Sequence, residues 1–338
     1  MKHIFRLTSS LFLLTSYLLL LTSCDYKDLC YDHSHMKSVN VQFLWPKSEQ
    51  TMVKGMTTLF YPAEQLSAEP VRYDFSGRDG GTARLTSGQY QVIAYNNDTE
   101  TILYRGTTAT GTLEAYTRQS SIEEGTQLTR AGMPRAAGTE EEPVILEPDP
   151  LWAASHKLLN LTSDGDSTVQ MRTIPRVFLV NITITHVPNL QYTGQFGGAL
   201  SGLAASVMME SGELSDEPAT QAFTAQVVGD STLEMRFHTF GHCPRRSQGN
   251  VHKHVLTIYA ILADGTKWYY TMDVSEQMHD PAKNPEIHYD PENPETLEIT
   301  YDIDIDLDDL PVPKPIVNGG GFQPTIDGWQ GVEIPVDM

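Results

Sequence analysis

The stretch HVLTIYAILADGTKWYYTMDV, His254–Val274, decides the fold class of this chain. Two runs of apolar, β-branched and aromatic residues, His254–Leu262 and Trp268–Val274, flank the dipeptide Asp264-Gly265. An Asp-Gly pair between two such runs is a strong hairpin signal, because the tight turn needs positive φ angles that these residues tolerate. The stretch therefore predicts two antiparallel strands joined by a short turn.

The same kind of pattern recurs on both sides of this hairpin. Short runs with strand composition alternate with turns rich in Gly, Pro, Asn and Asp, and no long amphipathic helix pattern interrupts them. This spacing predicts an all-β protein of the sandwich class. The further predicted strands are Val39–Trp45, Thr57–Tyr61, Val71–Phe75, Gln89–Tyr95, Ile102–Arg105, Arg176–Val187, Ala222–Val228, Leu233–Phe240 and Thr296–Ile305.

The first residues have the layout of an export signal. Lys2 and Arg6 precede an apolar, leucine-rich run, and Leu21-Thr22-Ser23-Cys24 follows it. A leucine at −3, small residues at −2 and −1, and cysteine at +1 resemble the bacterial lipobox, in which cleavage falls between Ser23 and Cys24 and lipid is attached to the thiol. Several acyl chains together make membrane anchoring stable.

Acidic residues directly follow the lipidated cysteine, beginning with Asp25. They resemble an inner-membrane retention signal of enteric bacteria and also a surface-export signal of gut and oral Gram-negative bacteria. The expected location is the outer membrane, with the chain anchored by its lipid at the cell surface, and the leaflet that holds the lipid is left open.

Composition limits the partners. The 23 basic and 43 acidic residues give a formal net charge of −20, and removal of Lys2 and Arg6 with the signal brings the mature chain to −22. Such a charge excludes nucleic acid as a partner, because phosphates need a basic surface. About 315 residues remain after cleavage, enough for two domains. Whether Cys30 and Cys243 pair is left open.

The expected organisation follows from these patterns and from a proline-rich, acidic stretch in mid-chain. The tail ends in a segment of alternating apolar residues, Val332–Val336, after a run rich in Pro and Gly. The predicted parts are a signal peptide (1–23), a tether (24–37), an N-terminal sandwich (38–130), a linker or surface loops (131–166), a C-terminal sandwich (167–310) and an extended tail (311–338).

Several motifs were weighed for chemistry. In Asp302–Asp309, a calcium loop would need Gly and Glu where Leu307 and Pro313 stand, so the alternation predicts a half-buried strand instead. The residues His238, His242, Cys243, His252 and His254 match no zinc-finger spacing, and no metal site is predicted from them.

No catalytic pattern emerges either. Ser201 lacks the flanking glycines of a nucleophile elbow, and no phosphate or dinucleotide motif is present, so the sequence predicts neither an enzyme nor a cofactor. Trp45, Trp152, Trp268 and Trp329 are interpreted as core residues, with a sugar-stacking platform as the alternative.

Two further sites are candidates for modification. Asp166-Ser167-Thr168 and Asp230-Ser231-Thr232 resemble an O-glycosylation signal of gut Gram-negative bacteria. Ser167 and Ser231 are therefore possible O-glycosylation sites.

One long segment carries a family resemblance. Gly88-Gln89-Tyr90-Gln91-Val92-Ile93-Ala94-Tyr95-Asn96-Asn97-Asp98-Thr99-Glu100 resembles a segment of fimbrillin-like lipoproteins of gut and oral Gram-negative bacteria. Shorter matches lie at Gly197–Gly202, Asp264-Gly265, Asp273–Ser275 and Ile326–Trp329. The resemblance implies two tandem transthyretin-like β-sandwiches and assembly into a pilus by strand exchange.

In those relatives a protease removes the first strand after an arginine, and the strand of a neighbouring subunit fills the groove. This chain departs from that pattern: Lys27 and Lys37 precede the first predicted strand, but the first arginine after Cys24 is Arg72. The chain is then a tip or anchor subunit, or a lipoprotein that does not polymerise.

Two functions remain open at this point. The first is a structural or adhesive pilus subunit whose partners are other pilin subunits, with Gly319–Met338 as the donor segment. The alternative is a monomeric surface lipoprotein that binds glycan or a host ligand.

Replacing Cys24 with alanine tests the anchor. We expect the Cys24→Ala chain to leave the membrane fraction for the soluble fraction, because no acyl chain holds it. A non-permeant protease applied to intact cells should degrade the unaltered protein. Its protection in intact cells would instead place it in the periplasm, and membrane retention of the variant would contradict lipidation.

Overall fold

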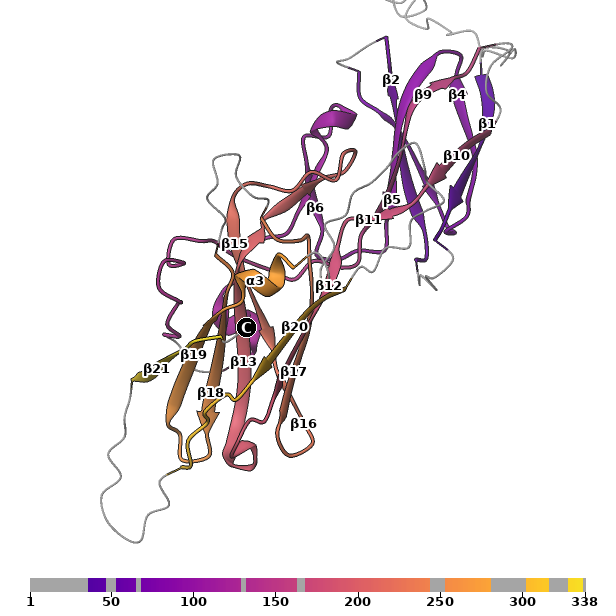
Figure 1. Ribbon diagram of the computed structural model, residues 1–338. Helices are drawn as coiled ribbons and strands as arrows, with labels where there is room; N and C mark the ends of the chain where they lie inside the picture. Colours follow the sequence, from indigo (N-terminus) through magenta and orange to yellow (C-terminus); the bar gives the residue numbers. More distant parts are fainter. Residues whose placement is uncertain are drawn as a thin grey trace, which may run out of the picture.

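The computed structural model shows two β-sandwiches that lie end to end (Figure 1). It describes residues 36–46, 53–64, 68–128, 132–162, 168–243, 253–280, 302–315 and 328–336. The predicted all-β sandwich class is confirmed.

The first sandwich pairs a three-stranded sheet, β10-β1-β4, with a five-stranded sheet, β11-β9-β5-β2-β3. Its core is built from alternate residues of β1, Val39, Val41 and Phe43, which face Phe60 and Val92 of the second sheet. The strands are β1 (Met36–Leu44), β2 (Met56–Pro62), β3 (Val71–Phe75), β4 (Gly80–Thr86), β5 (Gln89–Asn96), β9 (Trp152–Asn160), β10 (Thr168–Arg172) and β11 (Ile174–Pro175).

The second sandwich pairs a four-stranded sheet, β16-β17-β12-β20, with a six-stranded sheet, β21-β19-β18-β13-β15-β8. Phe223 and Phe237 stack across its core with their ring centroids 4.2 Å apart. The strands are β8 (Val144–Ile145), β12 (Phe178–Thr185), β13 (Thr193–Ala204), β15 (Pro218–Thr224), β16 (Gln226–Val228), β17 (Thr232–Thr239), β18 (Val255–Leu262), β19 (Lys267–Asp273), β20 (Asp302–Asp308) and β21 (Trp329–Ile334).

A third apolar cluster joins the two sandwiches. Leu59 and Ile93 on the outer face of the first sandwich pack with Val207, Met209 and other residues around a small sheet, β14-β7-β6. Burial of apolar surface on both sides of a domain boundary makes the boundary rigid. This sheet comprises β6 (Leu103–Arg105), β7 (Glu114–Tyr116) and β14 (Ser206–Met208).

Arg176 reinforces this junction. It lies between β11 of the first sandwich and β12 of the second, and its side chain is buried. Its guanidinium donates hydrogen bonds to the carbonyl oxygens of Met209 (3.0 and 3.2 Å) and Glu210 (3.1 Å). These carbonyls satisfy a buried cation that would otherwise be costly.

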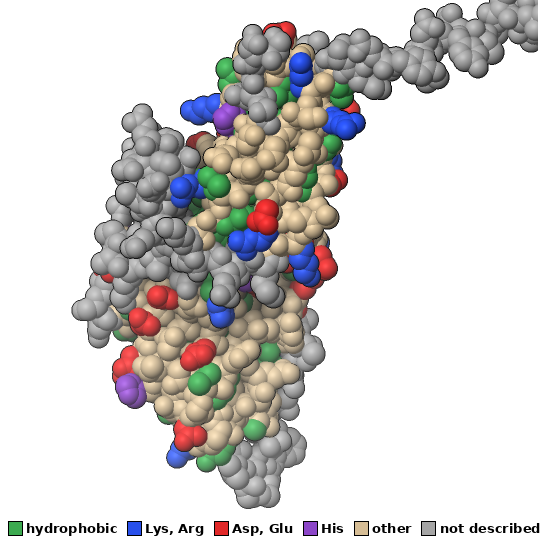
Figure 2. Space-filling model, turned by 90° about the vertical axis from the view of Figure 1, so that its right-hand side faces the viewer, with side chains coloured by type: hydrophobic (Ala, Val, Ile, Leu, Met, Phe, Trp, Pro, Cys, Tyr) green, Lys and Arg blue, Asp and Glu red, His purple; other side chains and the backbone are tan. Residues whose placement is uncertain are grey.

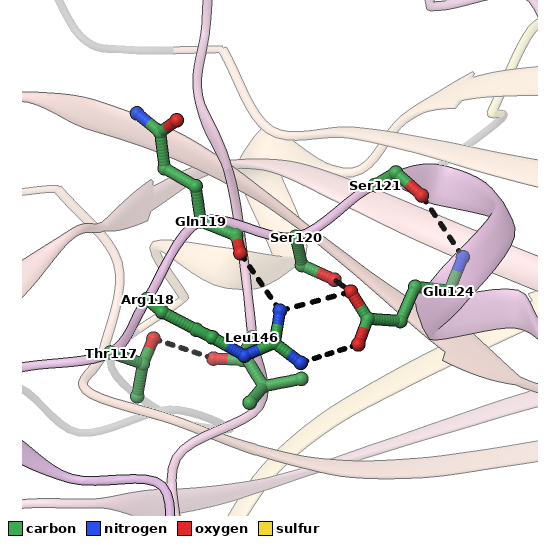
Figure 3. A network of polar contacts seen from close by, with 7 residues as sticks. All are labelled: Thr117, Arg118, Gln119, Ser120, Ser121, Glu124 and Leu146. Atoms are coloured by element: carbon green, nitrogen blue, oxygen red, sulfur yellow. Dashed lines mark hydrogen bonds and ion pairs between the residues drawn. The ribbon is translucent and has the colours of Figure 1, made fainter.

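Short helices complete the fold: η1 (Thr110–Thr112), α2 (Ile122–Thr126), η2 (Leu190–Tyr192) and α3 (Ser275–Met278). Helix α2 begins at Ser121, whose hydroxyl accepts a hydrogen bond from the Glu124 amide (Figure 3). The Glu124 carboxylate accepts hydrogen bonds from Arg118 and from the Ser120 hydroxyl. Those two partners, Arg118 first, lower the pKa of Glu124 to about 2.

The strand order corrects the predicted domain boundaries. Strand β9 lies within the predicted linker 131–166, yet it pairs with β5 near the middle of the first sandwich. Strand β10 begins at the predicted start of the second sandwich, yet it pairs with β1. The chain thus leaves the first sandwich after β5 and returns to it for β9–β11. The first three residues of β9, Trp152, Ala153 and Ala154, are all buried, so the sequence there shows no alternation.

The turn predicted at Asp79-Gly80-Gly81 also differs in detail, because β4 begins at Gly80. Gly80 has φ of +101°, and a Cβ at this position would lie 2.2 Å from the Val41 carbonyl oxygen. Only glycine permits this backbone angle and this close approach.

Other predictions are confirmed. The Asp264-Gly265 hairpin joins β18 and β19, with Gly265 at φ of +84°. In β20 the exposed fractions of Ile303, Ile305 and Leu307 are 9%, 0% and 8%, as the predicted alternation requires. Residues 296–301 of that predicted strand lie outside the described residues.

Matched leucine substitutions test the core. Leu200 is fully buried in the second sandwich, whereas the side chain of Leu158 is 50% exposed. We expect Leu200→Ala to lower the free energy of unfolding by about 2–5 kcal/mol, and Leu158→Ala to change it by less than about 0.5 kcal/mol. Denaturant titration measures both, and equal effects would contradict the assigned core.

Candidate strand-docking site

The C-terminal strand β21 docks on β19 at the edge of the six-stranded sheet. The two strands run parallel, and their register pairs Lys267 with Trp329 and Met272 with Ile334. β19 would otherwise present a row of unpaired backbone groups, which favours pairing with another chain. The tail of the chain therefore covers a sheet edge that can accept a strand.

Both faces of β21 contribute to docking. Val332 and Ile334 face the core of the second sandwich and are partly buried there. On the opposite face, Trp329 packs edge-on against Tyr259 with ring centroids 5.5 Å apart. The alternating apolar residues predicted for this tail thus fit a half-buried edge strand, held mainly by two aliphatic side chains and one tryptophan.

Gly331 brings the two strands close together. A Cβ at this position would lie 2.5 Å from the ring of Tyr269, the residue paired with Gly331 in the register. The ring of Tyr269 therefore lies over the backbone of the docked strand. A side chain at position 331 would clash with this ring.

A cleft lies where β21 ends. Its volume is about 480 Å³, and it is lined by Ile334, Pro335 and Val336 of the tail and by residues of helix α3. Asp273 at its rim is partly desolvated, which raises the pKa of this carboxyl, but hydrogen bonds from Ser275 and the charge of Lys253 lower the pKa overall. The cleft is thus framed by the tail, α3 and charged side chains.

Strand β1, at the other end of the described chain, contrasts with β21. It is the middle strand of its sheet, between β10 and β4, and Val39, Val41 and Phe43 are buried. Arg72, the first arginine after Cys24, lies on β3. An arginine-directed cut would therefore fall two strands beyond β1.

The predicted modification sites lie partly outside the described residues. Ser23, Cys24, Cys30 and Ser167 are among the residues whose structure is not described. Ser231 is exposed in the turn between β16 and β17, and its glycosylation stays a prediction. Cys243 is buried, and its Sγ lies 3.4 Å from the Leu203 carbonyl oxygen.

The histidines separate into two environments. His238 pairs with Glu147 at 3.0 Å, away from the others, and His252 lies outside the described residues. His242 and His254 come together, and the structure adds His279, which no sequence pattern had indicated. His279 lies at the end of α3, 25 residues beyond His254, so only the fold brings it close.

The tryptophans pack against other residues. Trp45 and Trp152 contact each other edge-on at 5.6 Å, and Trp268 packs on the core of the second sandwich. None of the four tryptophans is among the large apolar side chains exposed in the described part of the chain. Core packing is thus the role that the structure supports. Ser201 is also buried, and its hydroxyl accepts a hydrogen bond from the Val255 amide.

Figure 2 shows one face of the molecule, on which hydrophobic side chains occur as small separate groups. Acidic side chains are scattered over the second sandwich on this face. Small isolated apolar groups do not form a docking patch. Within the described residues, no helix has the length and apolarity to cross a membrane.

The fold of two sandwiches with a docked terminal strand resembles that of fimbrial and adhesin proteins. Over 336 residues the chain is 25% identical to "Putative fimbrium anchoring subunit Fim4B" of Bacteroides ovatus, covering 94% of this chain and 95% of that protein. The predicted family resemblance is confirmed by this match over nearly the whole length.

The chain belongs to the family described as "Domain of unknown function (DUF5119)", whose model matches residues 23–224. The fold is also similar to the crystal structure of "a putative adhesin from Bacteroides ovatus" at a TM-score of 0.55 and 22% identity. That similarity covers 86% of this chain and 99% of the other. These relatives carry fimbrial and adhesin names, not those of enzymes.

Two adjacent substitutions test the docking of β21. Ile334→Ser removes an apolar side chain from the core face, whereas Glu333→Ser changes an exposed residue of the same strand. We expect Ile334→Ser to speed amide hydrogen exchange in peptides covering Lys267–Asp273, because β19 loses its neighbour more often. Glu333→Ser should leave the exchange unchanged. Equal protection in both variants would contradict docking through the core face.

Proposed function

We propose that this protein is the anchoring subunit of a fimbrium, held in the outer membrane by lipid on Cys24 and joined to the next subunit by its C-terminal strand. The observation that carries the proposal is β21, a half-buried strand at the very edge of a sheet. The similarity to a fimbrium anchoring subunit over 94% of this chain supports the same role.

The two ends of the chain suit opposite tasks. β1 is buried in the middle of a sheet and no arginine lies between Cys24 and β1, so the first sandwich keeps its own strand and opens no groove. β21 is an edge strand whose core-facing side chains are only partly buried, and it can leave without exposing the centre of a sheet. A subunit that offers a strand but accepts none occupies one end of a polymer.

The position of the proposed lipid indicates which end of the polymer this subunit would occupy. A lipidated N-terminus at Cys24 fixes the first sandwich near the membrane, and β21 belongs to the second sandwich, which lies at the far end of the molecule (Figure 1). The donated strand therefore belongs to the sandwich that lies farther from the membrane. This arrangement fits an anchor at the base of the fimbrium better than a tip.

Strand exchange replaces the contacts of β21 within its own sheet with equivalent contacts in a neighbouring subunit. When β21 leaves β19, it loses backbone hydrogen bonds and the burial of Val332 and Ile334, and it regains equivalent contacts in the groove of a neighbour. Self-docking meanwhile protects the edge of the sheet from unwanted pairing. Twelve residues, 316–327, separate Pro315 from Gly328. Fully extended, they span at most roughly 40 Å, which permits transfer to an adjacent molecule.

A disulfide lock tests the proposal. Thr271 and Glu333 are register partners on β19 and β21, so the pair Thr271→Cys and Glu333→Cys can cross-link the tail to its own sheet. We expect cells carrying the locked protein to shed fimbrial subunits into the medium, because the anchor cannot donate its strand. Electron microscopy and blotting of the medium measure the loss.

The control is Thr271→Cys alone, which cannot form the lock and should retain fimbriae on the cell. Reductant should restore assembly in the double variant. Normal attachment of fimbriae by a fully oxidised double variant would contradict donation of β21.

A further inference from the structure

Three histidines from separate parts of the second sandwich converge on one point. His242 follows β17, His254 directly precedes β18, and His279 caps α3. Their ring centroids lie 4.8–5.5 Å apart, and one nitrogen of each ring lies within 4.8 Å of those of the other two. His254 is fully buried, and the other two are partly buried.

The backbone around the cluster is held by the sheet. The amide of Cys243 donates to the Gly202 carbonyl at 2.9 Å, which fixes the segment that carries His242. The amide of His254 donates to the Ser275 hydroxyl at 2.9 Å, and the Val274 amide donates to the His254 carbonyl at 2.8 Å. Side chains on a frame of this kind are positioned by the fold and not by loop conformation.

Backbone carbonyls orient two of the rings. Nδ1 of His254 lies 3.3 Å from the Ser201 carbonyl oxygen, and Nδ1 of His242 lies 3.2 Å from that of Cys243. A carbonyl oxygen can only accept, so these contacts favour the tautomer with the proton on Nδ1 and an unprotonated Nε2. Outer contacts of this type set the tautomer of histidines that ligate metal ions.

The spacing of one nitrogen pair is close to that of a metal centre, and the third nitrogen lies within 4.8 Å of both. Nε2 of His254 lies 3.1 Å from Nε2 of His279. Two nitrogens bound tetrahedrally to zinc at about 2.0–2.1 Å lie about 3.3 Å from each other. We propose that His242, His254 and His279 form a zinc site, with three imidazole ligands and a fourth position for water or a ligand from a partner.

Ligand chemistry favours zinc. Neutral imidazole suits borderline ions such as Zn²⁺, whereas Ca²⁺ and Mg²⁺ require oxygen ligands. His186, Asp308 and Asp309 form another group of possible ligands, but all three are exposed, and nothing else there points to an ion. The buried histidine cluster is therefore the stronger site.

A zinc ion here would reinforce the frame of the strand-docking site. It would tie His279, at the end of α3, to the start of β18. The side chain of Gln277 in α3 bonds both backbone groups of Asp306, on the open edge of β20. Helix α3 also lines the cleft beside Ile334. Zinc binding itself does not depend on the proposed strand exchange.

Zinc titration of the mature protein, purified with a tag that contains no histidine, tests the site. Competition with a chromophoric chelator gives the affinity, and elemental analysis gives the stoichiometry. We expect one zinc ion per chain at the cluster. His242→Gln and His279→Gln should each weaken binding by about 100-fold or more, since even an outer-shell loss costs about 10–100-fold. The matched control His156→Gln, outside the cluster, should bind as the unaltered protein does.

Circular dichroism checks that the variants fold, and Co²⁺ loaded into the unaltered chain gives a second readout. We expect the intense visible absorption of four-coordinate Co²⁺. Failure to bind zinc stoichiometrically, a six-coordinate cobalt spectrum, or zinc affinity in the His242→Gln and His279→Gln variants equal to that of the unaltered protein would overturn the proposal. In that case the 3.1 Å contact is a hydrogen bond between two imidazoles.

Discussion

The backbone of β19 needs a neighbour on each side, and this need organises the second sandwich. β18 satisfies one side through the Asp264-Gly265 hairpin, and β21 satisfies the other from the far end of the chain. The first contact is local and antiparallel, whereas the second closes a long loop and is parallel, a pairing that is slightly less stable per residue. β19 thus pairs on one side with the strand next to it in sequence and on the other with a strand from the end of the chain.

The junction between the sandwiches is built in the opposite way. The chain leaves the first sandwich after β5, contributes β6, β7 and β8 elsewhere, and returns for β9. Three crossings of the chain, a shared apolar cluster and the buried Arg176 connect the two sandwiches. In the proposed anchor, tension applied to the second sandwich would pass through this junction to the lipid on Cys24. A junction crossed more than once distributes that tension over several segments.

The hairpins and the alternating strands could be predicted from the sequence, because turn chemistry and period-two burial are local properties. β20 and the tail segment at Val332–Val336 are examples, since one face of each is apolar. The return of β9 to the first sandwich could not be predicted, because its first buried residues, Trp152, Ala153 and Ala154, are consecutive and so show no alternation. β13, buried from Phe196 to Ala204, was missed for the same reason. His279 could not be assigned to the histidine cluster from the sequence, because it lies 25 residues beyond His254 and only the fold brings the two together.

The position of α3 links the candidate sites physically. On one side Gln277 completes the hydrogen bonding of β20, on another the helix borders the cleft at the end of β21, and His279 at its end meets His254. This helix has a single turn and no side-chain cap, so its own hydrogen bonds cannot hold it in place. Its position depends on these tertiary contacts. Any ligand that holds His279 in place therefore also holds helix α3, which lines the cleft at the end of β21. In the proposed strand exchange, the stability of this helix would affect how readily β21 dissociates from β19.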